Sequence, residues 1–229
     1  MCAITALTVF VTEAPVMAAQ KDESAPAKVH PRKVLFLGNS ITLHGPKEDI
    51  GWTGNWGMAA TAEEKDYVHL VTKALTDRSG AAPETLVKNI ADFERQYATF
   101  DINAGLKDAL DFKADLVILA IGENVAELTS PDVQTKFKDA FKKLIETLQT
   151  RSHPRIVVRS CFPLMKAKDA ALKQAADETG VTYVDLSPLT PDESNYARSE
   201  RTIAHSGVGG HPGDKGMQRI AEAILKAIE

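Results

Sequence analysis

The chain lacks the features that mark a nucleic-acid-binding or membrane-spanning protein. Its 229 residues carry a net charge of −4, and no run of Lys and Arg provides a basic footprint for nucleic acid. Aromatic residues make up 6% of the chain and are not interleaved with basic ones. No apolar stretch approaches the roughly 20 residues that span a bilayer. The sequence therefore predicts no nucleic-acid partner and no membrane span.

Cysteine is also scarce, with only Cys2 and Cys161. Residues 1–19 contain no Lys or Arg, but they have a short apolar core followed by small residues at 16–18. This pattern resembles a secretory signal peptide without its basic region; a mis-assigned start codon and a frayed terminus are the alternatives. Removal of residues 1–19 would leave Cys161 alone and exclude an internal disulfide. We interpret Cys161 as a small buried residue at the end of a strand.

The remaining composition is that of an ordinary globular domain, with 44% hydrophobic and 25% charged residues. We therefore expect a signal peptide over 1–19, a flexible leader over 20–31 and a single domain over 32–229. A chain with these parts would be secreted or periplasmic.

Apolar runs alternate with helical patterns along the domain. Strands are expected at 33–38, 84–90, 114–122, 155–160 and 181–186, and helices at 59–78, 102–112, 132–150, 167–179 and 212–228. Residues 92–97 are expected to form a polar loop or short turn, and 187–210 a long loop. This alternation predicts an α/β fold whose parallel sheet has helices on both faces.

Polar residues follow the strands at their carboxyl ends, where open α/β sheets bind ligands. These residues are Ser40, Asn89, Asn124, Cys161 and Asp185, and His211 precedes the last helix. Right-handed crossovers would bring the first and third strands together, so Ser40 and Asn124 would share a crevice that His211 could reach.

This set of residues suits acyl transfer. A Ser hydroxyl needs a base to accept its proton, and His has a suitable pKa. The oxyanion that forms needs N–H donors, which the Asn124 side chain and the Ser40 backbone could supply. A role for Ser40 as a turn residue or helix cap is the alternative.

Residues 43–57 form an irregular stretch beside this crevice. They include Trp52, Trp56 and His44, together with four Gly and a Pro. Indole faces stack on sugar rings, so we expect Trp52 and Trp56, with His44, to bind substrate. Packing of the indoles into the core, and a solvated surface position for His44, are the alternatives.

Three blocks resemble the SGNH (GDSL-type) hydrolases. Gly38-Asn-Ser-Ile-Thr42 is similar to their GDSIT block, Gly122-Glu-Asn124 to their G-x-N block, and His211-Pro212 to their closing block. The resemblance implies a three-layer α/β/α sandwich with a five-stranded parallel sheet, flavodoxin-like and of SGNH hydrolase type. It also implies esterase chemistry with Ser40 as nucleophile, His211 as base and Asn124 as oxyanion donor.

The chain departs from the family pattern at three places. Val208 stands where the family has an Asp that orients the His. The orienting group could be a carbonyl of 206–210, as in family members with a Ser-His dyad, or a carboxylate of Glu200, Asp185 or Glu123. The second block has Asn89 but no Gly after it, and Asn39 replaces Asp in the first block. Asn39, Asn89 and Glu123 are therefore candidates for supporting the oxyanion site.

Three functions are compatible with these residues. The first is an esterase that removes an acyl group, most plausibly acetyl, from a carbohydrate, with a small-molecule or polysaccharide ester as its substrate and no cofactor or metal. The second is an inactive relative that binds glycan. The third is a metal enzyme that would use His205 and His211 with Asp185 or Asp214, although two His six positions apart do not have a standard ligand spacing. The acyl group, the glycan and the oligomeric state are left open.

Overall fold

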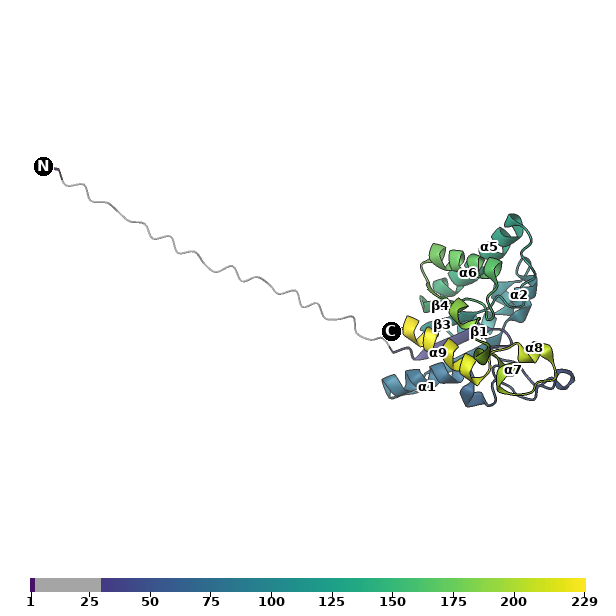
Figure 1. Ribbon diagram of the computed structural model, residues 1–229. Helices are drawn as coiled ribbons and strands as arrows, with labels where there is room; N and C mark the ends of the chain where they lie inside the picture. Colours follow the sequence, from purple (N-terminus) through teal and green to yellow (C-terminus); the bar gives the residue numbers. More distant parts are fainter. Residues whose placement is uncertain (3–29) are drawn as a thin grey trace.

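Five parallel strands form a single sheet in the order β2-β1-β3-β4-β5. The structure is a computed structural model that describes residues 1–2 and 30–229 (Figure 1). The strands are β1 (Lys33–Gly38), β2 (Glu84–Asn89), β3 (Leu116–Ala120), β4 (Arg155–Arg159) and β5 (Thr182–Val184). Gly38 is in register with Asn89 on one side and with Ala120 on the other. The carboxyl ends of β2, β1 and β3 therefore meet at one edge, as expected for the predicted fold.

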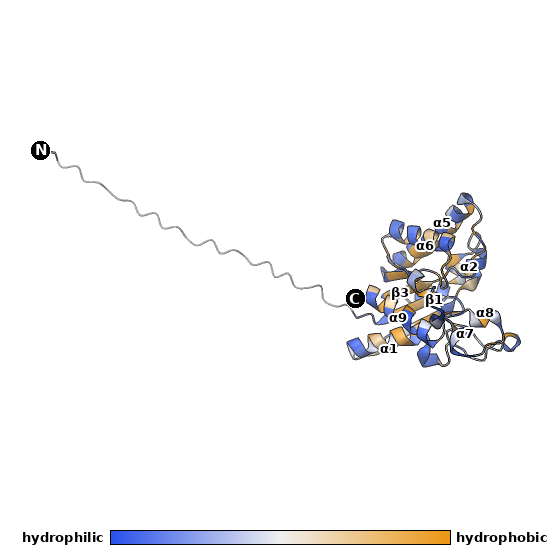
Figure 2. Ribbon diagram, viewed as in Figure 1, coloured by the Kyte–Doolittle hydropathy of each residue, from blue (hydrophilic) through white to orange (hydrophobic). Residues whose placement is uncertain are grey.

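Helices cover both faces of the sheet (Figures 1 and 2). Leu35 and Leu37 point to one face and Val34 and Phe36 to the other, because side chains alternate along a strand. The first face packs against α2 (Ala91–Gln96), α3 (Ile102–Gly105), α4 (Lys107–Asp111), α5 (Pro131–Ser152) and α6 (Lys166–Thr179). The second packs against α1 (Tyr67–Ser79) and α9 (Asp214–Ala227). The three-layer α/β/α sandwich is thus confirmed.

Local sequence explains where the long helices begin and end. Ser130 caps α5 by accepting a hydrogen bond from the Val133 N–H, and Pro131 occupies the first turn, where its missing N–H costs nothing. Asp66 caps α1 in the same way, and Gly80 ends that helix with a φ of 76°. The buried stripe of α5 is apolar, as its periodicity predicted: Phe137, Phe141, Leu144, Ile145 and Leu148.

Several short elements differ from the expectation. Residues 92–97 were expected to form a polar loop or short turn, but residues 92–96 belong to α2, in which Phe93 and Glu94 are buried, and Tyr97 follows the helix. The expected helix 59–78 begins only at Tyr67, after a 3-10 turn at Glu63–Lys65. The region 187–210 contains η3 (Ser187–Leu189), η4 (Glu193–Asn195), α7 (Ala197–Glu200) and α8 (Ser206–Gly209). Elements of three to six residues are too short to show a period in the sequence.

The predicted signal peptide and leader, apart from residues 1–2 and 30–31, lie outside the described residues. Among the helices that the structure describes, none combines the length and the hydropathy needed to cross a membrane.

Candidate active site

Ser40 lies in a tight turn directly after β1. The Asn39 carbonyl accepts hydrogen bonds from the N–H groups of Thr42 and Leu43, both at 2.9 Å, and the Asn39 side chain accepts one from the Ile41 N–H at 3.2 Å. A Cβ at Gly38 would lie 1.8 Å from the Thr42 Oγ1, so only glycine allows the turn to close this tightly. The turn thus presents Ser40 at the carboxyl edge of the sheet.

His211 contacts Ser40 through one ring nitrogen and a backbone carbonyl through the other. Its Nε2 is 2.7 Å from the Ser40 Oγ, and its Nδ1 is 2.7 Å from the Gly207 carbonyl oxygen. A carbonyl can only accept, so Nδ1 must carry a hydrogen. In the neutral ring Nε2 is then an acceptor, and the Ser40 hydroxyl donates to it. This is the arrangement that a general base requires.

The short helix α8 holds the carbonyl in place. The His205 side chain caps α8 by accepting a hydrogen bond from the Val208 N–H, and the His211 N–H donates to the Val208 carbonyl. The other side chains considered for orienting His211 have partners elsewhere. Glu200 accepts from the N–H groups of Asp214 and Lys215, Asp185 binds Ser187, and Glu123 binds Arg159.

Burial lowers the pKa of the His211 ring, and this effect exceeds the opposing effects of the Gly207 carbonyl and of Glu123. At neutral pH the ring is therefore neutral and able to accept a proton. Burial raises the pKa of the Cys161 thiol, which is fully buried as predicted, so Cys161 stays protonated and unreactive.

Asn124 follows β3 and lies beside Ser40 in the same cleft. Its side-chain Nδ2 donates to the Glu94 Oε2 at 2.8 Å. The N–H groups of Gly122 and Asn124 donate to the other Glu94 oxygen, at 2.6 and 3.2 Å. Gly122 adopts a φ of 130°, which favours glycine. The strand end is thus fixed to a buried carboxylate on α2.

Sequence reasoning missed Glu94. Its segment was expected to be a polar loop or short turn, in which a Glu has no special place. The adjacent Phe93, also buried, was the signal that this segment packs against the core. The partners of Glu94 are 28 to 55 residues away in the chain, so no local spacing indicates them.

Two N–H donors remain beside the Ser40 hydroxyl. The Ser40 N–H makes no hydrogen bond to any described residue, and the Asn124 amide has a second hydrogen beyond the one that Glu94 accepts. The N–H of Ala91, two residues after Asn89, is already engaged, because it donates to the Asn89 Oδ1 at 2.9 Å. The other Asn89 group donates to the Leu43 carbonyl, so Asn89 ties two loops together.

Two clefts meet at the Ser40–His211 pair. The first has a volume of about 560 Å³, and its polar lining includes His44, Lys47, Asn89, Asp92, Arg95 and His205. The second, of about 400 Å³, lies toward Glu123 and is lined by Phe162, Pro163, Met165, Tyr196 and Arg198. A substrate could thus place groups on both sides of the reacting atoms.

The predicted substrate-binding residues divide between two places. His44 lines the Ser40 cleft, but neither Trp does. Trp52 is only 6% exposed and donates its indole N–H to the His44 carbonyl, and Trp56 meets it edge to face with ring centres 5.6 Å apart. Both indoles border a neighbouring cleft of about 730 Å³, which shares Ile50, His205 and Val208 with the Ser40 cleft.

The residues considered for a metal do not converge. Both ring nitrogens of His211 have partners, and Asp214 binds Thr61 and Lys65. Within the described part of the chain, no group of three or more His, Cys, Asp or Glu is placed to hold a metal ion.

Solved structures with this fold include esterases that act on carbohydrates. One is an acetyl xylan esterase, AlAXEase, with 18% identity and a TM-score of 0.56 over 86% of this chain and 100% of that one. Another is a two-domain esterase active on acetylated mannans, with 15% identity and a TM-score of 0.58 over 86% of this chain and 48% of that one. A family two carbohydrate esterase from Cellvibrio japonicus has 21% identity and a TM-score of 0.50 over 89% of this chain and 63% of that one. Identities this low show a shared fold alone.

No curated protein is a significant match to this sequence. The family model of the GDSL-like Lipase/Acylhydrolase family matches residues 36–219, a span that runs from β1 through the Ser40 turn and His211 into α9. The chain therefore belongs to the GDSL-like lipase/acylhydrolase (SGNH) family of ester hydrolases.

Proposed function

We propose that the protein is a serine esterase that removes acetyl groups from a carbohydrate through an acyl-Ser40 intermediate, with a Ser-His dyad. The observation that carries the proposal is the chain of two 2.7 Å contacts from the Ser40 Oγ through His211 to the Gly207 carbonyl. These contacts support the role of His211 as a neutral base for the hydroxyl, with its tautomer fixed by the carbonyl.

In the first half-reaction, the Ser40 Oγ attacks the ester carbonyl carbon while His211 Nε2 takes the hydroxyl proton. The carbonyl oxygen becomes an oxyanion, and the Ser40 N–H and the Asn124 NH₂ donate to it. The bond between the carbonyl carbon and the sugar oxygen then breaks. The His211 imidazolium returns the proton to that oxygen, and the sugar leaves with a free hydroxyl.

In the second half-reaction, water attacks the acyl-Ser40 carbonyl and His211 accepts a proton from the water. As the second oxyanion collapses, the bond between the carbonyl carbon and the Ser40 Oγ breaks and the His211 imidazolium returns its proton to that oxygen. This step releases the carboxylic acid and restores the Ser40 hydroxyl and the neutral His211. The overall reaction consumes one water for each ester and needs no cofactor.

The carbohydrate part of the proposal rests on two supports. The solved structures that share this fold include an esterase of acetylated mannans and an acetyl xylan esterase. The Ser40 cleft also offers hydrogen-bonding side chains such as Asn89, Asp92 and Arg95, which suit a sugar better than a fatty acyl chain. Export of the chain, proposed from residues 1–19, would bring such an enzyme to polysaccharides outside the cytoplasm.

The glycan-binding alternative is motivated by the missing Asp at position 208 and by the missing Gly after Asn89. The Gly207 carbonyl takes the place of that carboxylate at Nδ1, so the base is oriented without it. We therefore favour turnover over binding alone.

The test compares acetylated xylo-oligosaccharides with p-nitrophenyl palmitate as substrates, and it measures released acid. We expect acetate release with a higher kcat/KM than for the long-chain ester. Faster hydrolysis of the palmitate would overturn the carbohydrate assignment. Glycan binding by calorimetry without acetate release would support the binding-only alternative.

A further inference from the structure

Glu94 is a buried carboxylate that the proposed acyl transfer does not use directly. The side chain is 0% exposed, and burial together with the nearby Glu123 raises its pKa. A charged group in such a place is costly unless several donors compensate it. Glu94 has four, all on residues that flank the active site: the N–H groups of Gly122 and Asn124, and the side-chain NH₂ groups of Asn124 and Asn39.

The two carboxylate oxygens of Glu94 have different hydrogen-bond partners. Oε1 accepts from three donors, the Gly122 N–H, the Asn124 N–H and the Asn39 Nδ2. Oε2 accepts only from the Asn124 Nδ2, at 2.8 Å. A carboxylate cannot donate, so this contact fixes which end of the Asn124 amide is the nitrogen. The second amide hydrogen is left free for the cleft.

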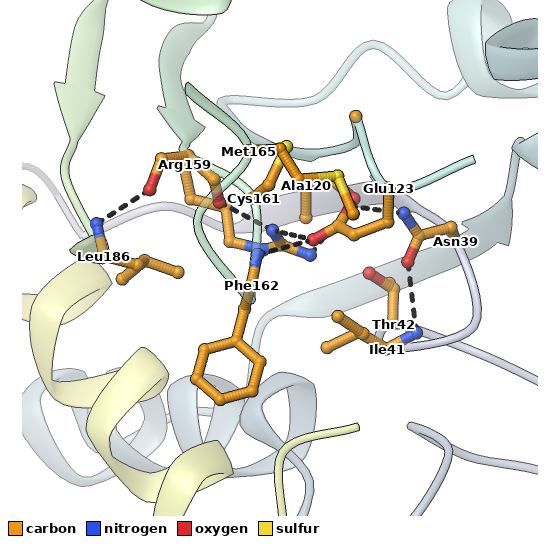
Figure 3. A network of polar contacts seen from close by, with 12 residues as sticks. Asn39, Ile41, Thr42, Ala120, Glu123, Arg159, Cys161, Phe162, Met165 and Leu186 are labelled. Atoms are coloured by element: carbon orange, nitrogen blue, oxygen red, sulfur yellow. Dashed lines mark hydrogen bonds and ion pairs between the residues drawn. The ribbon is translucent and has the colours of Figure 1, made fainter. Parts of the chain in front are cut away.

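Glu94 is also part of a polar network with Asn39, Glu123 and Arg159. The Asn39 Nδ2 bridges two carboxylates, with 3.1 Å to Glu94 Oε1 and 2.6 Å to Glu123 Oε2. Figure 3 shows Glu123 between Asn39 and Arg159, whose fully buried guanidinium donates to Glu123 at 2.6 Å. The Arg159 guanidinium thus neutralises the Glu123 carboxylate. The Asn39 amide lies between the carboxylates of Glu94 and Glu123 and donates to both.

We infer that Glu94 is a positioning residue that locks the Asn124 amide in the orientation that donates to the oxyanion. The inference rests on the proposed function and assigns a task to a residue to which the family resemblance gave no role. Without the carboxylate, the Asn124 amide can turn its oxygen toward the cleft, where it would repel an oxyanion rather than stabilise it.

The decisive experiment is a double-mutant cycle with Glu94→Gln and Asn124→Ala. In E94Q, the three donors that now meet Oε1 hold the oxygen of the new amide. Its NH₂ group then lies against the Asn124 NH₂ and forces the Asn124 amide to flip. We expect E94Q to lower kcat by about 10- to 1,000-fold with little change in KM, because an oxyanion contact forms only in the transition state. In the N124A background, E94Q should cause almost no further loss.

The matched control is Asp169→Asn, which changes another buried carboxylate that accepts two backbone N–H groups, from Cys161 and Met165. It should lower the unfolding temperature and leave kcat close to wild type. A wild-type kcat for E94Q, or losses that add fully in E94Q/N124A, would overturn the inference. Failure of the proposed function itself is distinguished by Ser40→Ala, which would then retain activity.

Discussion

The Nδ1 of His211 lies 2.7 Å from the carbonyl oxygen of Gly207, at the position that an Asp side chain would take in a triad. A carbonyl fixes the tautomer and direction of the ring as a carboxylate does, but it brings only a partial charge to the imidazolium that the proposed mechanism requires. No carboxylate near the site should therefore be essential for orienting His211.

Glu200→Gln tests that consequence. Glu200 binds the first two N–H groups of α9 rather than His211, so its replacement should weaken a helix cap. We expect a loss of about 0.5–2 kcal/mol in the free energy of unfolding by urea, and a kcat near that of wild type. His211→Ala is the positive control and should abolish turnover. A hundredfold or larger fall in kcat for E200Q would instead point to a triad.

The pH profile of kcat/KM reports the base in the free enzyme. Because burial lowers the pKa of His211, its proton is lost below the usual value of about 6.5. Activity should be full at neutral pH and fall on the acid side with an apparent pKa under 6.5. An acid limb centred above 6.5 would contradict the dominance of burial.

The lowered pKa of His211 also makes the free energy of unfolding depend on pH. Below pH 6.5 the unfolded chain takes up a proton at His211 that the folded protein resists, so the unfolded state binds more protons. The stabilisation that this His contributes is present above the unfolded pKa and is lost as pH falls through the folded pKa. Urea unfolding of wild type and His211→Gln across this range should show a difference that shrinks toward acid pH; a difference that grows would contradict the sign.

Asn39→Asp would place a third carboxylate between Glu94 and Glu123. The new oxygen would replace a donor that is 2.6 Å from Glu123 and 3.1 Å from Glu94. We expect a loss of about 2–5 kcal/mol at pH 8, by analogy with an uncompensated buried charge. Protonation of one carboxyl relieves the repulsion, so the loss should be smaller at pH 5.

The compensating variant is Asn39→Asp with Glu123→Gln. The oxygen of the new amide at position 123 can accept from Arg159 and from the Phe162 N–H. Its NH₂ group can donate to the new carboxylate at position 39, which restores the net charge of the network. Chemical denaturation should show partial recovery of stability at pH 8. The absence of any recovery would argue against the Asn39–Glu123 contact as the source of the loss.

Gly38→Ala should displace the Ser40 turn. Its Cβ would overlap the Thr42 Oγ1, which is hydrogen-bonded to the Tyr67 hydroxyl in the core. We expect a cost of about 1–3 kcal/mol together with a clear fall in kcat. Gly80→Ala is a matched control, because Gly80 has a positive φ but nothing within 4 Å of a new Cβ. It should cost about 1 kcal/mol of stability and leave kcat unchanged.

The sequence was sufficient to predict the fold because β1 and β3 are continuous apolar runs that lead into Gly38-Asn-Ser40 and Gly122-Glu-Asn124. It also predicted that Ser40, Asn124 and His211 would approach one another, since each follows or precedes an element that ends at the same sheet edge. The structure brings these three residues into one cleft.

Two parts of the site could not be predicted. The Gly207 carbonyl belongs to the backbone and has no signature in the sequence. The sequence therefore left both a carbonyl and three carboxylates as candidates for the group that orients His211. Glu94 lies on a six-residue helix, and its side-chain partners follow β1 and β3, so only the tertiary fold brings them together. Trp52 and Trp56 were expected at the Ser40 cleft because they lie in the irregular stretch that follows Ser40. Their indoles pack against each other and line the neighbouring cleft instead.

The most direct test of the account is the rate of acetate release by Ser40→Ala from an acetylated oligosaccharide, with circular dichroism to verify the fold. The loss of the nucleophile should reduce kcat by about 10³-fold or more while glycan binding persists. Release at a rate close to wild type would contradict the acyl-Ser40 mechanism, and with it the role assigned to His211.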